Sequence, residues 1–302
     1  MRCAPCVSVW NRRVTDGFLA VDKPSGITSH DVVARVRKAT GIRRAGHAGT
    51  LDPMATGLVV VGLGRATRLI RFVQDADKEY LATARFGVAT DSLDADGVET
   101  GRSPMDVTFE QLADAALSLT GVIDQVPPMV SALKVDGRRL YELAREGTEV
   151  HREARPVTVH SLEILDVGTG PFPDVRLRVV CGKGTYVRVL ADDLAGRLGG
   201  RAHLVSLRRT RTGVFSVDEH AITVEQLADG WREAVVSPSD ALAALPAIEV
   251  DRAGATAVGH GRSLPPGGYP PGTHLRVIDG DGRLLAVFRS DPDAVRPEVV
   301  LG

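Results

Sequence analysis

The spacing of apolar residues along the chain predicts strands and helices that do not alternate regularly. Apolar or alternating runs predict strands over residues 18–22, 58–62, 80–86, 157–165 and 175–181. Apolar stripes at helical spacing predict helices over residues 29–40, 108–119, 138–146 and 187–198. Regular alternation would favour a doubly wound parallel sheet, so its absence favours an α+β fold with a mixed or antiparallel sheet.

The first helix is predicted to be amphipathic and basic. Ser29 is its expected N-cap, and Gly41 is expected to end it. Three valines form its apolar stripe, while Arg35, Arg37 and Lys38 lie on the other side. This arrangement leaves a row of positive charge facing solvent.

Residues 247–302 predict a small β-rich unit after a change of composition near residues 237–246. Two apolar runs flank Asp279-Gly-Asp-Gly282, a turn sequence typical of hairpins. We therefore expect a flexible extension over residues 1–15, a main α+β domain over 16–240, and the β-rich unit over 247–302.

The charge is close to balanced overall but uneven along the chain. The 302 residues carry a formal net charge of -1, and a quarter of them are charged. Residues 11–71 hold 11 Lys or Arg against 4 Asp or Glu, whereas residues 72–131 hold 3 against 11. The basic first part could follow the phosphates of a nucleic acid, or it could be a solvated face.

The cysteines and the hydropathy exclude several classes of protein. Cys3 and Cys6 form a C-x-x-C pair, but a structural zinc needs four ligands and only Cys181 remains, so we expect a reduced, flexible extension. No run approaches the roughly 18 apolar residues of a membrane span, and no export signal begins the chain. We expect a cytoplasmic protein without membrane contact.

Asp52 is the main candidate for chemistry. The segment from residue 43 to 57 has no apolar period and is expected to be a long ordered loop, of the kind that usually has a function. Pro53 favours an extended conformation at Asp52, so the carboxylate is presented on a constrained loop. On this evidence it is a nucleophile, a general base, a metal ligand or a turn-forming aspartate.

The surroundings of Asp52 argue against cofactors. The nearest other acids are Asp31 and Asp75, and no ligand stands at metal-binding spacing beside Asp52. A glycosidase pair would need a second carboxylate that the sequence does not single out. The run Gly62-Leu-Gly-Arg-Ala-Thr67 departs from the known phosphate-binding patterns. We expect neither a metal nor an organic cofactor.

Six separate strings, covering residues 17–215, resemble the successive motifs of TruB-type pseudouridine synthases in order and spacing. They are Asp22-Lys-Pro-Ser-Gly-Ile-Thr-Ser29, Arg44-Ala-Gly-His-Ala-Gly-Thr-Leu-Asp-Pro-Met-Ala-Thr-Gly57, Lys78-Glu-Tyr-Leu81, Gln125-Val-Pro-Pro-Met-Val-Ser-Ala-Leu-Lys134 with Gly137 and Tyr141, Gly182-Lys-Gly-Thr-Tyr-Val-Arg188, and His203-Leu-Val-Ser-Leu-Arg-Arg-Thr210. Several motifs at family spacing make coincidence far less probable than one short pattern does.

The resemblance implies a tRNA-modifying isomerase. Such an enzyme detaches uracil from its ribose, turns it and rejoins it through carbon 5, at the T-loop uridine of tRNA (position 55 in standard tRNA numbering). The base must first be flipped out of its stack. The fold implied is an α+β catalytic domain with a mixed sheet and a C-terminal RNA-binding unit that resembles a PUA domain. Within that unit Gly261-Arg-Ser-Leu-Pro265 is the clearest feature.

The resemblance also implies site residues. Asp52, Tyr80 and Arg188 would be catalytic: Asp52 as the catalytic carboxylate, Arg188 as its partner, and Tyr80 stacked on the target base. Each has a plainer reading, as a turn aspartate, a core tyrosine or a surface arginine. The residues that would bind substrate are Lys23, His47, Asp94, Lys134 and Leu207. Lys23 could equally be structural, Asp94 a solvated turn residue, and Leu207 plain core.

Two other functions compete with this prediction. One is the guide-RNA-dependent branch of the same superfamily, which modifies ribosomal RNA with protein partners. The absence of long basic tails favours the stand-alone branch, working on the T-arm of tRNA as a monomer. The other is a non-catalytic RNA-binding folding factor, against which the presence of Asp52, Tyr80 and Arg188 argues.

Overall fold

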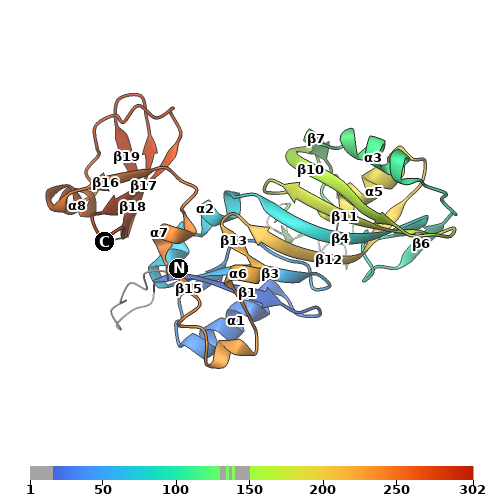
Figure 1. Ribbon diagram of the computed structural model, residues 1–302, viewed down its shortest axis with the longest axis horizontal. Coiled ribbons are helices and arrows are strands. Elements are labelled where there is room, and N and C mark those ends of the chain that lie inside the picture. The colour runs from blue at the N-terminus through green and yellow to red at the C-terminus, as the bar shows by residue number, and fades with distance from the viewer. Residues whose placement is uncertain (1–15, 130–133, 136–137, 140–149, 302) are drawn as a thin grey trace, which may run out of the picture.

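The structure is a computed structural model, and it describes residues 16–129, 134–135, 138–139 and 150–301. The predicted extension over residues 1–15, with Cys3 and Cys6, lies outside the described residues. Two sheets organise the rest: a long twisted sheet runs through the body of the molecule, and a smaller one forms a separate lobe at one end (Figure 1).

The main sheet is mixed, as the irregular order of predicted elements indicates. Its continuous path runs β14 (Ala221–Thr223), β1 (Gly17–Lys23), β3 (Thr56–Leu63), β12 (Ala202–Thr212), β4 (Lys78–Phe86), β11 (Asp174–Cys181), β10 (Arg155–Val167) and β7 (Gly121–Gln125). Short strands pair at its side, namely β2 (Ala45–His47) on β3, β13 (Phe215–Ser216) on β12 and β15 (Val235–Val236) on β1. The β12–β3 and β1–β14 pairs are parallel and the others antiparallel. The predicted fold class is confirmed.

The helices pack on both faces of this sheet. They are α1 (Ser29–Thr40), α2 (Ile70–Asp75), α3 (Phe109–Leu117), α5 (Val187–Arg197), α6 (Val217–His220) and α7 (Pro238–Ala241), with 3-10 turns η1 (Gly64–Leu69) and η2 (Gln226–Ala228). Of these, α1, α3 and α5 contribute to the apolar cluster on one face, and α2, α6 and α7 to the cluster on the other. The buried stripe of α1 joins the inner face of β1 and β3, while α3 and α5 cover the other end of the sheet. A small hairpin of β5 (Val88–Thr90) and β6 (Glu99–Arg102) lies beside β12.

Strands β1 and β3 are buried on both faces. Leu19 and Val59 point into the cluster that includes α1, whereas Phe18 and Leu58 point into a second cluster on the opposite face. Successive side chains of a strand point to opposite faces, so a strand covered on both sides carries apolar residues at every position. This explains the unbroken apolar run at the start of β3.

The C-terminal lobe covers part of that second face, together with residues of η1, α2, β13 and α7. It contains the sheet β16 (Ala247–Val250), β17 (His274–Asp279), β18 (Leu284–Ser290) and β19 (Val295–Val300), with α8 (Arg252–Gly259) packed against it. The predicted hairpin is confirmed as β17 and β18, and the Asp279 carboxylate accepts from the Arg283 N–H at 2.9 Å in its turn. Leu284, Val287 and Leu301 of this lobe belong to the apolar cluster under β1 and β3.

Three of the arginines from the basic first part of the chain contact this lobe. Arg65 and Arg68 donate to the main-chain carbonyls of Leu301 and Val300, at 2.6 and 2.5 Å. Arg71 forms an ion pair with Glu298 at 2.6 Å. These three guanidinium groups therefore hold the end of the chain in place. The number of basic residues in the first part of the chain does not show which of them bind the lobe and which are free to bind phosphates.

Local details of three predictions were wrong. The N-cap of α1 is Thr28, which forms a capping box with Asp31, because the Ser29 hydroxyl is used elsewhere. The long loop from residue 43 contains β2 and ends where β3 begins, since pairing with β3 orders three residues that show no alternation. The helix over residues 138–146 does not begin at Arg138, because Arg138–Arg139 pair with Lys134–Val135 as strands β9 and β8. Residues 140–149 lie outside the described residues.

Candidate active site

The loop that carries Asp52 is tied down on both sides of that residue. The Leu51 N–H donates to the Ser29 hydroxyl at 2.8 Å, which attaches the loop to the start of α1. The Pro53 carbonyl accepts from the Gly26 N–H at 2.9 Å and from the Lys23 ammonium at 3.1 Å. With its neighbours anchored in this way, Asp52 has a fixed main chain and can direct its carboxylate in one direction.

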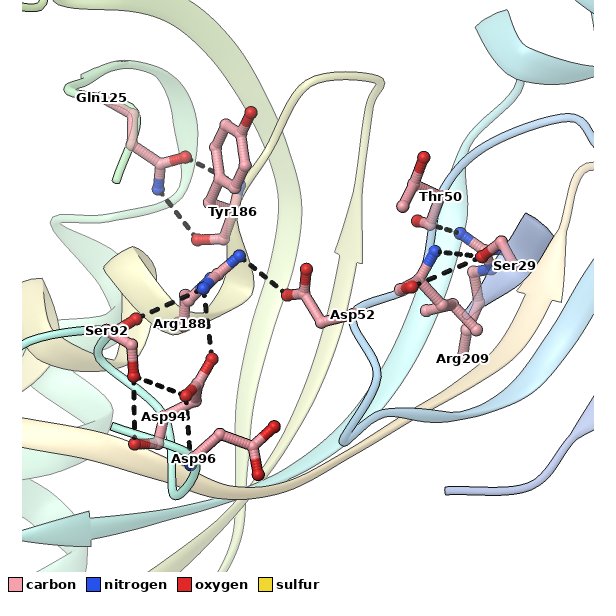
Figure 2. A network of polar contacts seen from close by, with 11 residues as sticks. Ser29, Thr50, Asp52, Ser92, Asp94, Asp96, Gln125, Tyr186, Arg188 and Arg209 are labelled. Atoms are coloured by element: carbon pink, nitrogen blue, oxygen red, sulfur yellow. Dashed lines mark hydrogen bonds and ion pairs between the residues drawn. The ribbon is translucent and has the colours of Figure 1, made fainter. Parts of the chain in front are cut away.

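The Asp52 carboxylate points toward Arg188, which lies in the first turn of α5. One carboxylate oxygen of Asp52 lies 2.9 Å from Nη2 of Arg188, and Nη1 of the same guanidinium lies 3.1 Å from a carboxylate oxygen of Asp94 (Figure 2). Nη1 also donates to the Ser92 carbonyl at 3.3 Å. Arg188 and Asp94 have almost no exposed side-chain area, whereas 36% of the Asp52 side chain is exposed. Arg188 therefore bridges an open carboxylate and a buried one.

Asp94 is a buried partner of Arg188. Its other carboxylate oxygen accepts from the Ser92 hydroxyl at 2.5 Å and from the Asp96 N–H at 3.2 Å. Both oxygens are thus occupied by protein donors. This geometry differs from the direct tRNA contact that the resemblance implies, and it favours a role in orienting Arg188. A turn aspartate in solvent, the plainer alternative, does not fit the burial of Asp94 either.

The electrostatics of Asp52 combine burial with an opposing cation. Burial raises the pKa of the Asp52 carboxyl above its usual range, the Arg188 guanidinium acts against that rise, and the charge of Asp94 adds to it. Asp52 therefore combines a pKa raised by burial with a neighbouring guanidinium that favours its ionised form.

Asp52 and Arg188 meet at one wall of a cavity of about 610 Å³. Tyr80 in β4 and Leu207 in β12 line the same cavity, and both are at least nine-tenths buried. Burial raises the pKa of the Tyr80 phenol, so this side chain stays neutral near neutral pH. The structure therefore brings four residues predicted from separate motifs, Asp52, Tyr80, Arg188 and Leu207, to one place.

Lys23 and His47 lie outside the lining of the cavity. Lys23 is fully buried and its ammonium donates to the carbonyls of Pro24, Ile27 and Pro53, while burial lowers its pKa to about 8. His47 packs edge-on against the His30 ring at 5.0 Å, and burial lowers its pKa as well. Neither side chain lines the cavity in the structure. For Lys23 this geometry favours the structural alternative.

Lys134 cannot be placed at the site. Its main chain belongs to β8, and its side chain lies outside the described residues. Among the described residues, no group of three or more His, Cys, Asp or Glu side chains is arranged to hold a metal ion. Within the same part of the chain, no helix is long and apolar enough to cross a membrane.

Sequence reasoning missed two polar residues of the cavity. Gln125 at the end of β7 makes two hydrogen bonds to the main chain of Tyr186, accepting at 2.7 Å and donating at 3.2 Å, and so fixes the start of α5 just before Arg188. Arg209 lies on the opposite side, under the Asp52 loop (Figure 2). Both stand inside motif strings quoted above, which was the available signal, but no local pattern separates them from their neighbours.

Three family models match the chain in succession, from residue 37 to 302. The model described as TruB family pseudouridylate synthase (N terminal domain) matches residues 37–187. Residues 188–245 match the tRNA pseudouridylate synthase B C-terminal domain, and residues 245–302 match tRNA Pseudouridine synthase II, C terminal. Fold and family models together define the class, which is that of the pseudouridylate synthases.

Similarity to individual proteins shows which family within this class the chain belongs to. The chain is 48% identical to tRNA pseudouridine synthase B of Aromatoleum aromaticum, over 93% of this chain and 90% of the relative. It is 46% identical to the protein of the same name from Thermobifida fusca, over 95% and 99%. The fold is similar to a crystal structure of a Cbf5-Nop10-Gar1 complex, with a TM-score of 0.76, 29% identity, and 95% of this chain and 85% of that chain covered. The chain belongs to the TruB family, and it is a tRNA pseudouridine synthase, an isomerase.

Proposed function

We propose that this enzyme isomerises the T-loop uridine of tRNA, at position 55, with Asp52 as the catalytic carboxylate. The observation that carries the proposal is the Asp52–Arg188 pair, 2.9 Å apart at the wall of a cavity that Tyr80 and Leu207 also line. A cavity of about 610 Å³ has room for a nucleoside that has left its stack. Extruding such a base costs a few kcal/mol, which RNA contacts elsewhere must offset.

The carboxylate acts at the ribose carbon that loses its base. When the bond between N1 and C1′ breaks, its electron pair leaves with uracil and C1′ becomes electron-poor. The Asp52 carboxylate supplies negative charge there, by bonding to C1′ or by stabilising the cation. After uracil turns, C5 bonds to C1′, the C5 proton leaves and N1 gains a proton. Atoms and charge balance without metal or cofactor.

The remaining side chains either contact the RNA or hold a catalytic residue in position. Tyr80 stacks on the flipped base, and Leu207 closes the cavity beside it. His47 and Lys134 contact RNA near the extruded nucleotide. Asp94 acts through Arg188, which it holds in place at 3.1 Å.

Residues 247–302 serve as a PUA-like RNA-binding unit in this proposal, beside a catalytic domain over residues 16–240. Residues 237–302 carry 6 Lys or Arg against 8 Asp or Glu, so the unit recognises RNA through its shape and a local patch and not through a net positive charge. The enzyme works as a monomer on the T-arm, in the cytoplasm.

The direct test uses purified full-length protein and an unmodified tRNA transcript, with no guide RNA and no added metal. Pseudouridine is mapped by chemical probing, and we expect it at position 55 alone. A transcript with cytidine at that position is the matched substrate control, and Asp52→Asn, which keeps the shape and loses the charge, is the matched protein control. Both should give no product. Product only after addition of a guide RNA would favour the guide-dependent alternative, and product with Asp52→Asn at the wild-type rate would exclude Asp52 as the catalytic carboxylate.

A further inference from the structure

Arg209 is a buried cation that the proposed mechanism has not yet used. It is only 2% exposed, and it is among the largest fully buried side chains of the described residues. No ion pair formed by the described residues includes it, whereas the adjacent Arg208 pairs with Asp22 at 2.7 Å. A buried charge without a counter-ion is unfavourable unless hydrogen bonds compensate it.

The compensation comes from carbonyl groups on both sides of Asp52. Nη2 of Arg209 donates to the Gly49 carbonyl at 3.2 Å and Nη1 to the Thr50 carbonyl at 3.4 Å, both within the loop and before Asp52. Nε donates to the Leu58 carbonyl at 2.7 Å, in β3 just after the loop. A planar guanidinium offers its donors in a fixed geometry, so it sets the spacing of the carbonyls that it binds. The side chain therefore spans the base of the loop.

The main chain of Arg209 contacts the same loop. Arg209 pairs in parallel with Gly57, which has a φ of +98°, and a Cβ at Gly57 would lie 2.2 Å from the Arg209 carbonyl oxygen. Only glycine permits so close an approach with this backbone conformation. Loop and strand β12 are thus fitted to each other by main chain and side chain together.

Arg209 also lies directly opposite Tyr80. The two are register partners in the antiparallel pairing of β12 with β4, so their side chains project from the same face of the sheet, and both line the cavity. Although burial raises the pKa of Tyr80, the Arg209 charge acts to lower it. Arg209 therefore contacts the loop that carries Asp52 and also pairs with Tyr80 in the neighbouring strand.

We propose that Arg209 is a positioning residue for the isomerisation, an inference that rests on the function proposed above. Its guanidinium holds the main chain before and after Asp52, so that the carboxylate meets Arg188 beside Tyr80. Arg209 does not itself touch the reacting atoms.

The test compares full-length wild type with Arg209→Gln, Arg209→Lys and the control Arg208→Gln. Single-turnover rates at saturating unmodified tRNA and tRNA affinities are measured, and circular dichroism with thermal unfolding checks that each variant is folded. We expect Arg209→Gln to lower the rate about 100-fold, the effect of misplacing a catalytic group by about 1 Å, with affinity within about threefold of wild type. Arg209→Lys keeps the charge without the planar fork, so we expect a loss of about tenfold. Arg208→Gln removes only a partly exposed pair, and its rate should stay within about threefold.

A pH profile separates positioning from a purely structural role. If the loop moves in Arg209→Gln, Asp52 lies farther from Arg188, the attraction that lowers the pKa of Asp52 weakens, and the acid limb of the rate profile moves to higher pH. A purely structural role would reduce the folded fraction and leave that limb in place.

Three further outcomes overturn the inference. Folded Arg209→Gln with a rate within threefold of wild type would show that the loop does not depend on Arg209. If Arg209→Gln does not fold, a full rate in Arg209→Lys would show that the charge alone suffices. Absence of pseudouridine with the wild-type protein would contradict the proposed function itself and this inference with it, which distinguishes the two failures.

Discussion

The cavity wall and the face covered by the C-terminal lobe differ in what they bury. At the cavity, Arg188, Asp94 and Arg209 are charged and almost fully enclosed, and each is satisfied by specific partners. Under β1 and β3, the buried groups are apolar, and the nearby arginines Arg65 and Arg71 keep 41% and 49% of their side chains exposed. A lost partner at the cavity leaves an enclosed charge, while a lost partner at the lobe leaves a solvated one. The cavity should therefore be sensitive to charge, and the lobe interface to volume.

The largest effect is expected for Arg188→Ala. It leaves Asp52 and Asp94 without their shared cation, so we expect a rate loss of about 1000-fold at saturating tRNA and a loss of about 3–5 kcal/mol in the free energy of unfolding. Affinity for tRNA should change little, because Arg188 is enclosed. Single-turnover kinetics, binding assays and urea unfolding measure the three quantities.

The matched control is Arg178→Ala. Arg178 pairs with Glu163 at 3.6 Å, and both side chains are about half exposed, so less than about 1 kcal/mol should be lost. If Arg188→Ala weakened tRNA binding as much as it slowed the reaction, Arg188 would belong to the RNA-binding surface.

At the lobe interface, stability should depend on the volume of the buried apolar side chains, and Val287→Ala tests this. Val287 is fully buried in the cluster shared with β1 and β3, so the cavity left behind should cost about 2 kcal/mol of unfolding free energy. The single-turnover rate at saturating tRNA should not change. Deleting residues 247–302 would remove Leu284, Val287, Val299 and Leu301 from this cluster at once, so the point substitution is the cleaner experiment.

Val122→Ala is the control for Val287, since Val122 is 74% exposed and its truncation should be nearly neutral. An equal loss of stability in both variants would mean that the lobe contact contributes nothing specific. A fall in the saturated rate of Val287→Ala would mean that the lobe shapes the active site.

The pH dependence of the wild-type rate follows from Asp52. The proposed chemistry needs the ionised carboxylate, and burial places its pKa above the usual value, so activity should begin to fall at a higher pH than an ordinary aspartate allows. Below that pKa the rate should drop about tenfold per pH unit. A single-turnover profile, with folding checked at each pH, measures this. A rate unchanged down to about pH 4 would contradict the raised pKa.

The smallest effect is expected for Arg71→Ala. Its pair with Glu298 is short, at 2.6 Å, but half of the Arg71 side chain is exposed, so we expect a loss of less than about 1 kcal/mol of stability that shrinks further at high salt. Thermal unfolding at two salt concentrations checks it. A loss of several kcal/mol, independent of salt, would show that the lobe interface depends on charge after all and would remove the contrast with the cavity.

Prediction from sequence succeeded where the signal was local. The alternating run of β4 and the helix predicted from residue 108 depend on neighbours within a few residues, and the structure confirms both as β4 and α3. It failed at α1, where Thr28 and Ser29 are both good caps, because the choice depends on Leu51, more than twenty residues away. Adjacent candidates with the same chemistry can be told apart only by their distant partners.

The candidate site divides in the same way. Asp52, Tyr80 and Arg188 could be chosen because each stands in a motif string, and the structure brings them together around one cavity. The burial of Asp94 could not be foreseen, since its sequence surroundings are those of a polar turn. It follows from the packing of that turn against β12, where Asp94 bridges to Leu204.

The sequence by itself determined five strands of the main sheet, the helices α1, α3 and α5, the hairpin of β17 and β18, the constrained loop at Asp52 and membership of the family, because periodicity, turn residues and motif spacing act over short stretches of chain. Only the tertiary structure decided which charges meet. Arg188 bridges Asp52 and Asp94, and Arg209 spans the base of the Asp52 loop, because the pairing of β12 with β3 and β4 brings distant segments into contact. Two adjacent arginines, Arg208 and Arg209, are equivalent in sequence and opposite in role, since neighbouring residues of a strand face opposite sides of the sheet.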